Sequence, residues 1–314
     1  MSPDPALQTS NMKDLAASLR GQSFVLPKLD TLMTGWPSYF GKNYEKLQAI
    51  AETKYVKLGL TGNKLKRLRR INCPLPASCW WPEATLEAGI TFLYWFMFIF
   101  AWDDELEDIH RRDVAGDSIE AQAFRRDTLL FIEHYLGLSS TEGEAPLPPS
   151  QGVGTFTELG DLLKAQYNIT QRKRWLCLKV GLLDYSHPHQ DMQVLQDEAN
   201  RNISAVNDIL SLKKELRDNC VLSLIPVCVY NGMELQTAID TTWDFLKGVV
   251  ERFEAAAKRL LEFVGENSAD YGRTVVFVDA LRTTQTGNML WSIETDRYGL
   301  AKRKREDGSM VVEL

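Results

Sequence analysis

Several signatures of common enzyme classes are missing from this chain. It has no glycine-rich phosphate loop, no Gly-x-Ser-x-Gly motif and no dinucleotide-binding fingerprint. These absences argue against a P-loop NTPase, a serine hydrolase of the α/β type and a Rossmann enzyme. Histidine is also rare, and the four histidines form no recognisable catalytic or metal-binding pattern.

Cysteine is scarce as well. The five cysteines are odd in number and include no Cys-x-x-Cys pair, so neither a disulfide framework nor a zinc site is predicted. This usage fits a reducing compartment, and we expect a cytoplasmic protein. Residues 1–19 lack the apolar segment of a signal peptide. The longest apolar run, 90–102, is shorter than the ~20 residues that span a bilayer, so no stable membrane anchor is expected.

Basic residues are outnumbered. The chain has 36 Lys and Arg against 42 Asp and Glu, giving a net charge of -6. Such a balance argues against nucleic acid as a partner, because phosphate backbones favour basic surfaces. An anionic small molecule remains compatible, since a bound metal can reverse the local charge. The oligomeric state stays open, with a homodimer among the alternatives.

Strand signals are few, and helix signals are many. No alternating apolar run is bounded by an Asn-Gly or Asp-Gly turn, whereas apolar residues often recur every three or four positions. The 314 residues therefore predict one all-α domain at 23–300, with flexible tails at 1–22 and 301–314. Helices are expected at about 39–60, 83–102, 119–136, 155–172, 174–185, 191–216, 219–231, 234–264 and 269–295.

An apolar and aromatic run, 90–102, leads into a dense acidic cluster. Carboxylates this close repel one another unless a cation lies among them, and a hard divalent cation such as Mg²⁺ prefers their oxygens. Aromatic residues of the run could line a pocket beside this metal site or simply pack in the core. Phe92, Phe96 and Phe100 have the better case for a pocket, because their i, i+4, i+8 spacing leads to Asp104. The five carboxylates are those of Asp103, Asp104, Glu105, Glu107 and Asp108.

A second polar group of residues lies on the helix expected at 191–216. At 100° per residue, Asn207, Ser211 and Glu215 fall at about 0°, 40° and 80° on the helical wheel, and Lys214 falls beside them. Three oxygen ligands at this spacing can hold one hard cation, with water completing its shell. A solvated surface stripe with i, i+4 contacts is the alternative.

Three segments of the chain resemble motifs of class I terpene synthases. Asp103-Asp-Glu-Leu-Glu107 matches the aspartate-rich DDxxD/E motif of that family. Asn207-Asp-Ile-Leu-Ser-Leu-Lys-Lys-Glu215 matches its second metal motif, (N/D)Dxx(S/T)xxxE, and 287–298 resembles its terminal Arg-Tyr segment. In motif order and spacing, from about Phe24 to Leu300, the chain is similar to fungal-type sesquiterpene cyclases such as aristolochene synthase.

The resemblance implies a helical bundle around a central active-site cavity. In it, farnesyl diphosphate would ionise to an allylic carbocation, and diphosphate and a sesquiterpene hydrocarbon or alcohol would be released. The family implies three Mg²⁺ ions, and the released diphosphate can accept the final proton. The resemblance implies metal ligands at Asp103, Asp104, Glu107, Asn207, Ser211 and Glu215. It implies diphosphate-binding residues at Arg172, Lys214, Arg297 and Tyr298, and pocket residues at Phe92, Phe96, Phe100 and Trp291. The implied catalytic residues are Asp103, Arg297 and Tyr298.

The chain departs from the family pattern at the diphosphate-sensing arginine. The family has a Tyr-x-x-x-Arg helix start upstream of the second motif, but here the region reads Tyr167-Asn-Ile-Thr-Gln-Arg-Lys-Arg-Trp175. Arg172 is the first choice for the sensor, and Arg174 is the second.

Three other functions compete with a sesquiterpene cyclase. A chain-elongating prenyltransferase of the same superfamily normally carries two DDxxD motifs, whereas the second motif here is of the Asn/Ser/Glu type. A diterpene synthase differs only in substrate length, which the motifs do not fix. A non-catalytic helical interaction protein would use the acidic cluster as a docking surface and would bind no metal.

Overall fold

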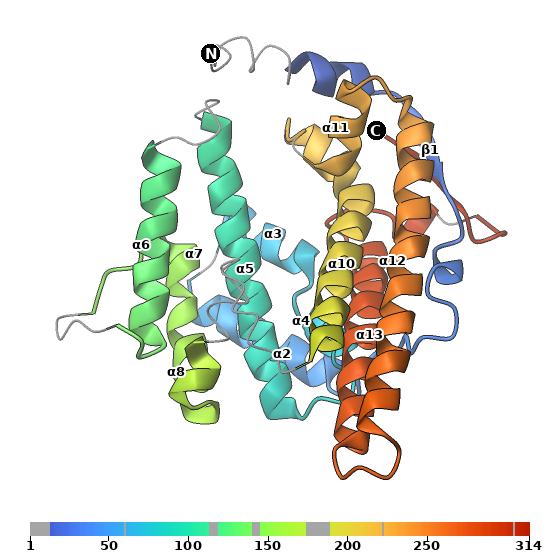
Figure 1. The fold of residues 1–314 in the computed structure, drawn as a ribbon. Helices are drawn as coiled ribbons and strands as arrows, with labels where there is room; N and C mark the ends of the chain where they lie inside the picture. Colours follow the sequence, from blue (N-terminus) through green and yellow to red (C-terminus); the bar gives the residue numbers. More distant parts are fainter. Residues whose placement is uncertain are drawn as a thin grey trace, which may run out of the picture. The chain divides into compact units, whose positions relative to one another are not determined.

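The computed structural model describes residues 13–59, 61–112, 119–139, 145–173, 189–221, 223–303 and 305–314. Helices dominate this part of the chain and are accompanied by a single two-stranded sheet, so the all-α fold class is confirmed (Figure 1). The described residues divide into two compact units. Unit 1 contains the described residues before 43, at 70–83 and after 188. Unit 2 contains the described residues at 43–69 and 84–173. The central cavity expected for the bundle stays a prediction.

Unit 1 is built on three long helices, α10 (Gln190–Arg217), α12 (Leu235–Val264) and α13 (Tyr271–Glu294), which lie against one another (Figure 1). Each helix contributes an apolar stripe, as its 3.6-residue periodicity requires, and the stripes meet in a core that excludes solvent. The shorter elements of this unit are α4 (Pro74–Cys79), α11 (Leu224–Tyr230) and the 3-10 turns Leu29–Thr31 and Ala301–Arg303.

A close crossing fixes α13 against α4. A Cβ atom at Gly287 would lie 2.5 Å from the carbonyl oxygen of Cys79, so only glycine allows this approach. The Cys79 thiol donates to the Gly287 carbonyl oxygen at 3.2 Å, and its burial raises the pKa of Cys79 to about 12. Pro74 occupies the first turn of α4, where a missing N–H costs nothing.

Unit 2 is organised around α5 (Leu86–Arg112), which contacts four other helices of the unit. The sequence predicted that this helix would end near residue 102, but it continues through the acidic cluster. Neither glycine nor proline occurs between residues 90 and 112, so nothing breaks the helix there. The other helices with residues in unit 2 are α2 (Tyr44–Lys57), α3 (Gly62–Ile71), α6 (Ile119–Tyr135), α7 (Gln151–Gly154) and α8 (Phe156–Gln166).

The apolar part of α5 also bears on membrane association. By length and composition alone, Leu86–Leu106 could cross a bilayer, with a mean hydropathy of 1.2, and 39% of that stretch is buried. A core helix meets the same criterion, so this is weak evidence for a membrane span.

The remaining expected helices follow the sequence pattern with three exceptions. The helix expected at 155–172 is interrupted after α8, because Tyr167 has extended backbone angles (φ -125°, ψ 139°). The helix expected at 219–231 is reduced to α11, because Asn219 has a φ of 57° and ends α10. The helix expected at 174–185 lies outside the described residues, as does Arg174.

The two expected tails are partly ordered. Residues 13–19 are helical, and strand β2 (Met310–Glu313) pairs antiparallel with β1 (Ser23–Leu26). Alternate side chains of both strands are buried, as a pleated ribbon with one covered face requires. The flexible tail predicted at 301–314 is therefore wrong for its last residues, because their pairing partner lies at the other end of the chain.

We expect the β1–β2 pair to contribute measurably to stability. Met310 is 2% exposed, so Met310→Ala should lower the free energy of unfolding by about 2–4 kcal/mol through lost burial and a residual cavity. Val311→Ala, at a half-buried position on the other face, should cost less than about 1 kcal/mol. Urea unfolding measures both, and equal losses in the two variants would contradict the observed strand orientation.

Candidate active site

The acidic cluster occupies the C-terminal part of α5 in unit 2. Taking Phe92 as 0° on the helical wheel, Asp103 falls at about 20° and Glu107 at about 60°, the same face as the aromatic stripe. Phe96 and Phe100 stack with their ring centroids 6.1 Å apart. The helix thus places carboxylates and aromatic rings in line along one face. The side chain of Glu107 lies outside the described residues.

Two other carboxylates of the cluster have structural partners. Glu105 points to the opposite side of α5 and accepts hydrogen bonds from the Ser150 hydroxyl and from the Gly152 amide, the latter at 3.3 Å. Asp108 forms an ion pair with Arg67 at 3.4 Å. The cluster therefore divides by helix face, which leaves the metal role predicted for Asp103 and Asp104 compatible with the geometry.

The polar stripe of α10 is largely removed from solvent. Ser211 is 2% exposed and Lys214 is 7% exposed, so a solvated surface stripe does not describe it. The Ser211 hydroxyl donates to Glu215 Oε1 at 2.6 Å, which leaves the lone pairs of its oxygen available to a cation. Burial raises the pKa of Glu215 despite the bonds that Ser211 and Ser223 donate. Lys214 lies 3.8 Å from Asp218, one turn along the helix.

The terminal Arg-Tyr segment meets this stripe directly within unit 1. The side-chain amide of Asn207 donates to the Tyr298 hydroxyl at 3.0 Å, and Tyr298 is 6% exposed. That bond turns the Asn207 amide so that its carbonyl oxygen, a metal-type ligand, remains available. The structure thus brings together two of the three motifs of the sequence analysis.

Trp291 supports the Arg-Tyr segment. Its ring lies edge-on to Tyr298 with centroids 5.6 Å apart, and its indole N–H donates to the Ile71 carbonyl at 2.8 Å. The hydroxyl of Thr295 donates to the carbonyl of Arg70 at 2.7 Å, and the backbone amide of Arg297 donates to that hydroxyl at 3.3 Å. The pocket role predicted for Trp291 stays a prediction beside this packing role.

Helix α3 carries a run of basic residues at 64–70, and its arginines contact three different parts of the chain. Arg69 pairs with Glu52 at 2.7 Å, and the Arg70 guanidinium donates to the carbonyl of Asp296 at 3.2 Å. With Arg67 also paired, the run serves as helix surface and as support for the Arg-Tyr segment.

Arg172 has a local partner in unit 2. Its guanidinium donates to the carbonyl oxygen of Leu136, just beyond the end of α6, while its Nε atom is buried with no partner among the described residues. This contact places Arg172 at a helix end, and its role as diphosphate sensor stays a prediction.

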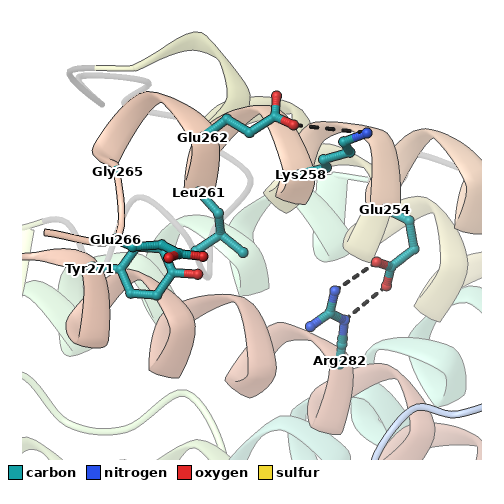
Figure 2. A pocket seen from close by; sticks show the side chains of 8 residues that line it. All are labelled: Glu254, Lys258, Leu261, Glu262, Gly265, Glu266, Tyr271 and Arg282. Carbon is teal, nitrogen blue, oxygen red and sulfur yellow. Dashed lines mark hydrogen bonds and ion pairs between the residues drawn. The ribbon is translucent and has the colours of Figure 1, made fainter.

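A surface pocket of about 500 Å³ lies elsewhere in unit 1, where α12 passes into α13 (Figure 2). Its charged side chains pair mainly with one another: Arg282 with Glu254 at 2.6 Å, and Lys258 with Glu262 at 3.8 Å. None of the predicted site residues lines it. Among the described residues, no three His, Cys, Asp or Glu side chains are grouped so that they alone could hold a metal.

Sequence reasoning missed the residues that support the motifs. Ser150 and Ser223 each donate to a motif carboxylate, and Thr295 accepts from the backbone amide of Arg297; the three residues come from different parts of the chain. Serine and threonine are common at helix starts and in loops, so composition gave no signal for them. Only the tertiary arrangement identifies these contacts.

We expect the Asn207–Tyr298 bond to contribute to stability. Tyr298→Phe should lower the free energy of unfolding by about 1 kcal/mol, because a buried donor loses its acceptor. Tyr39→Phe, which removes an exposed bond to Glu83, is the matched control and should cost less. A thermodynamic cycle with Asn207→Ala isolates the pair, and a coupling energy of zero would contradict the bond.

Known proteins resemble this chain over different spans. Residues 175–252 match the family model "Terpene synthase family 2, C-terminal metal binding", which includes the stripe of α10. The sesquiterpene cyclase hepA of Aspergillus oryzae is 26% identical over 360 residues, covering 98% of this chain and 95% of that protein.

Solved structures show the same fold. A linalool/nerolidol synthase from Streptomyces clavuligerus aligns with a TM-score of 0.62 at 14% identity, covering 82% of this chain and 98% of that one. The 2-methylisoborneol synthase of Streptomyces coelicolor A3(2), solved with Mg²⁺ and 2-fluoroneryl diphosphate, aligns with a TM-score of 0.64 at 15% identity, covering 86% and 97%. With the three motifs, these findings make the chain similar to class I terpene synthases: to their metal-binding family model over 175–252, and to a fungal sesquiterpene cyclase over almost its whole length.

Proposed function

We propose that the protein is a magnesium-dependent sesquiterpene synthase that ionises farnesyl diphosphate and releases diphosphate with a sesquiterpene hydrocarbon or alcohol. The observation that carries the proposal is the buried polar stripe of α10, where Asn207 bonds Tyr298 and Ser211 bonds Glu215. Removing amide, hydroxyl and carboxylate groups even partly from water is costly, and a metal site accounts for their grouping on one face of α10.

The donor set fits magnesium. Asn207, Ser211 and Glu215 offer three kinds of oxygen ligand on one helix face, and Mg²⁺ prefers such oxygens together with substrate phosphates and water. Asp103, Asp104 and Glu107 are proposed as the other ligands, for three ions in all. Bound Mg²⁺ would stabilise the negative charge that develops on the departing diphosphate.

The remaining polar residues would bind and orient the diphosphate. Lys214 offers a compact cation, Tyr298 a hydroxyl donor, and Arg297 a planar fork that matches phosphate oxygens. Arg172 is the proposed sensor. Aromatic side chains would keep water from the carbocation and stabilise it by roughly 0.5–2 kcal/mol each. The proposed pocket residues are Phe92, Phe96, Phe100 and Trp291.

Other details belong to the same proposal. We place the enzyme in the cytoplasm, which fits the free thiols of Cys79 and Cys228. The oligomeric state stays open, with a homodimer as one alternative. A diterpene synthase or a prenyltransferase would use the same metals on a longer or a second substrate, whereas an interaction protein would not respond to Mg²⁺.

Product analysis tests the proposal. The purified protein is incubated with Mg²⁺ and, separately, with geranyl, farnesyl or geranylgeranyl diphosphate, and the organic extract is analysed by gas chromatography and mass spectrometry. A cyclic C15 product from farnesyl diphosphate is expected. A C20 hydrocarbon would indicate a diterpene synthase. An elongated diphosphate, formed when isopentenyl diphosphate is added and detected as its alcohol after phosphatase treatment, would indicate a prenyltransferase. The absence of any product would refute the enzymatic function.

Asp103 provides a direct test of the aspartate-rich motif. Asp103→Ala should reduce turnover at least about 100-fold without unfolding the protein, because a preorganised group facing the diphosphate is lost. Asp108→Ala removes a carboxylate from the same helix that is paired with Arg67, and should change turnover far less. Circular dichroism monitors folding, and full activity of Asp103→Ala would place the metals elsewhere.

Glu215 provides the corresponding test of the second motif. Glu215→Ala should raise the Mg²⁺ concentration for half-maximal turnover by about tenfold or more, since a charged ligand is removed. Glu262→Ala, a mostly exposed carboxylate on α12, is the control and should leave the Mg²⁺ dependence unchanged. An unchanged dependence in Glu215→Ala would remove this residue from the ligand set.

A further inference from the structure

The carboxylate of Glu215 is held at both of its oxygens. Ser211, one turn earlier on α10, donates to Oε1 at 2.6 Å. Ser223, which precedes α11, donates to Oε2 at 2.5 Å. The second contact comes from outside the metal motif, and nothing in the motif pattern requires it.

Ser223 behaves unusually for its position. It is the residue before the first turn of α11, with extended backbone angles (φ -81°, ψ 168°), yet its hydroxyl makes no bond to the amides of that helix. Serine at this position normally accepts from such an amide. Here the Leu224 amide donates to Asp208 Oδ2 of α10 at 2.9 Å instead. Asp208 thus accepts a hydrogen bond from the first amide of α11, and the Ser223 hydroxyl donates to Glu215.

The end of α10 fixes the chain that carries Ser223. Asn219 adopts the left-handed conformation with a φ of 57°, its amide donates to the Leu216 carbonyl at 3.1 Å, and the Cys220 amide donates to the Glu215 carbonyl at 2.8 Å. This pair of bonds is a Schellman motif, which ends a helix in one defined direction. Val221 follows with 2% exposure and anchors the turn. The described backbone therefore leaves α10 in one defined direction before it reaches Ser223.

We propose that Ser223 is a positioning residue for the metal ligand Glu215, an inference that rests on the proposed function. Its hydrogen bond limits rotation of the carboxylate, so that the remaining lone pairs of Glu215 and those of Ser211 face one cation together. Partners of this kind, which orient a ligand without touching the metal, typically change metal affinity 10–100-fold when removed.

A purely structural role would have a different consequence. If Ser223 only ties α11 to α10, its loss would lower stability without changing the response to metal. The two roles therefore separate when metal binding is measured apart from stability and apart from turnover.

The experiment uses the full chain and thermal unfolding with Mg²⁺ titrated at a fixed, saturating concentration of inorganic pyrophosphate. A ligand that binds the folded state raises the midpoint according to its concentration and dissociation constant. Mn²⁺ bound in the presence of pyrophosphate, counted by electron paramagnetic resonance, gives a second readout. The variants are Ser223→Ala, the near-isosteric Ser223→Cys with its weak donor, and Ser223→Thr, which keeps the hydroxyl. Ser268→Ala removes an exposed bond to the Asp270 amide and is the control.

We expect Ser223→Ala and Ser223→Cys to raise the Mg²⁺ concentration for half-maximal stabilisation by about tenfold. Ser223→Thr should restore it to within about threefold, since threonine is tolerated before a helix. An unchanged Mg²⁺ response in Ser223→Ala, or no rescue by Ser223→Thr, would overturn the inference alone. A wild-type protein that ignores Mg²⁺ and pyrophosphate would overturn it together with the proposed metal site. Failure to make a terpene, with the metal response intact, would count against the proposed function only.

Discussion

Helix α10 carries an apolar face and a polar face that are both removed from water, and much of the packing of unit 1 follows from this constraint. One face buries apolar side chains such as Leu195 and Ala199 against α12 and α13. The other keeps polar groups out of water, where each unpaired group would cost about 1–3 kcal/mol. Hydrogen bonds offset that cost: Asn207 bonds Tyr298, and Glu215 accepts from Ser211 and Ser223. Elements distant in sequence therefore converge on this stripe.

Unit 2 resolves a related problem by helix geometry. Five carboxylates within six positions would repel one another strongly if they shared a face. Because α5 continues to Arg112, they are instead spread around the helix, and Glu105 and Asp108 find partners in Gly152 and Arg67. The carboxylates that remain beside the aromatic stripe are those that the motif assigns to metal. An extended loop would not hold these side chains on separate faces in this way.

Local pattern explains why the sequence predicted the fold class and the helix that carries the second metal motif. The stripe of Asn207, Ser211 and Glu215 follows from helical periodicity alone, which needs no knowledge of the partners. The β1–β2 pair was not predictable, because Ser23 and Glu313 lie at opposite ends of the chain and no turn joins their strands. The same holds for Ser223: its contact with Glu215 depends on the left-handed Asn219 and on tertiary packing, and no propensity encodes it.

The position of Tyr298 over Asn207 depends on the register of two whole helices. α10 meets α13 at two successive levels and the segment after α13 at a third, in parallel order. Val278 joins the core cluster of Leu195, the Asn288 amide donates to the Ile203 carbonyl at 3.4 Å, and Asn207 donates to Tyr298 at 3.0 Å. A slip of one turn moves a helix by about 5.4 Å, which no side-chain rotation at Tyr298 could correct without losing the bond. The close crossing at Gly287 and the bond from Trp291 to Ile71 oppose such a slip. The geometry of the Arg-Tyr segment is therefore set by packing along the full length of α13, far from the polar groups themselves.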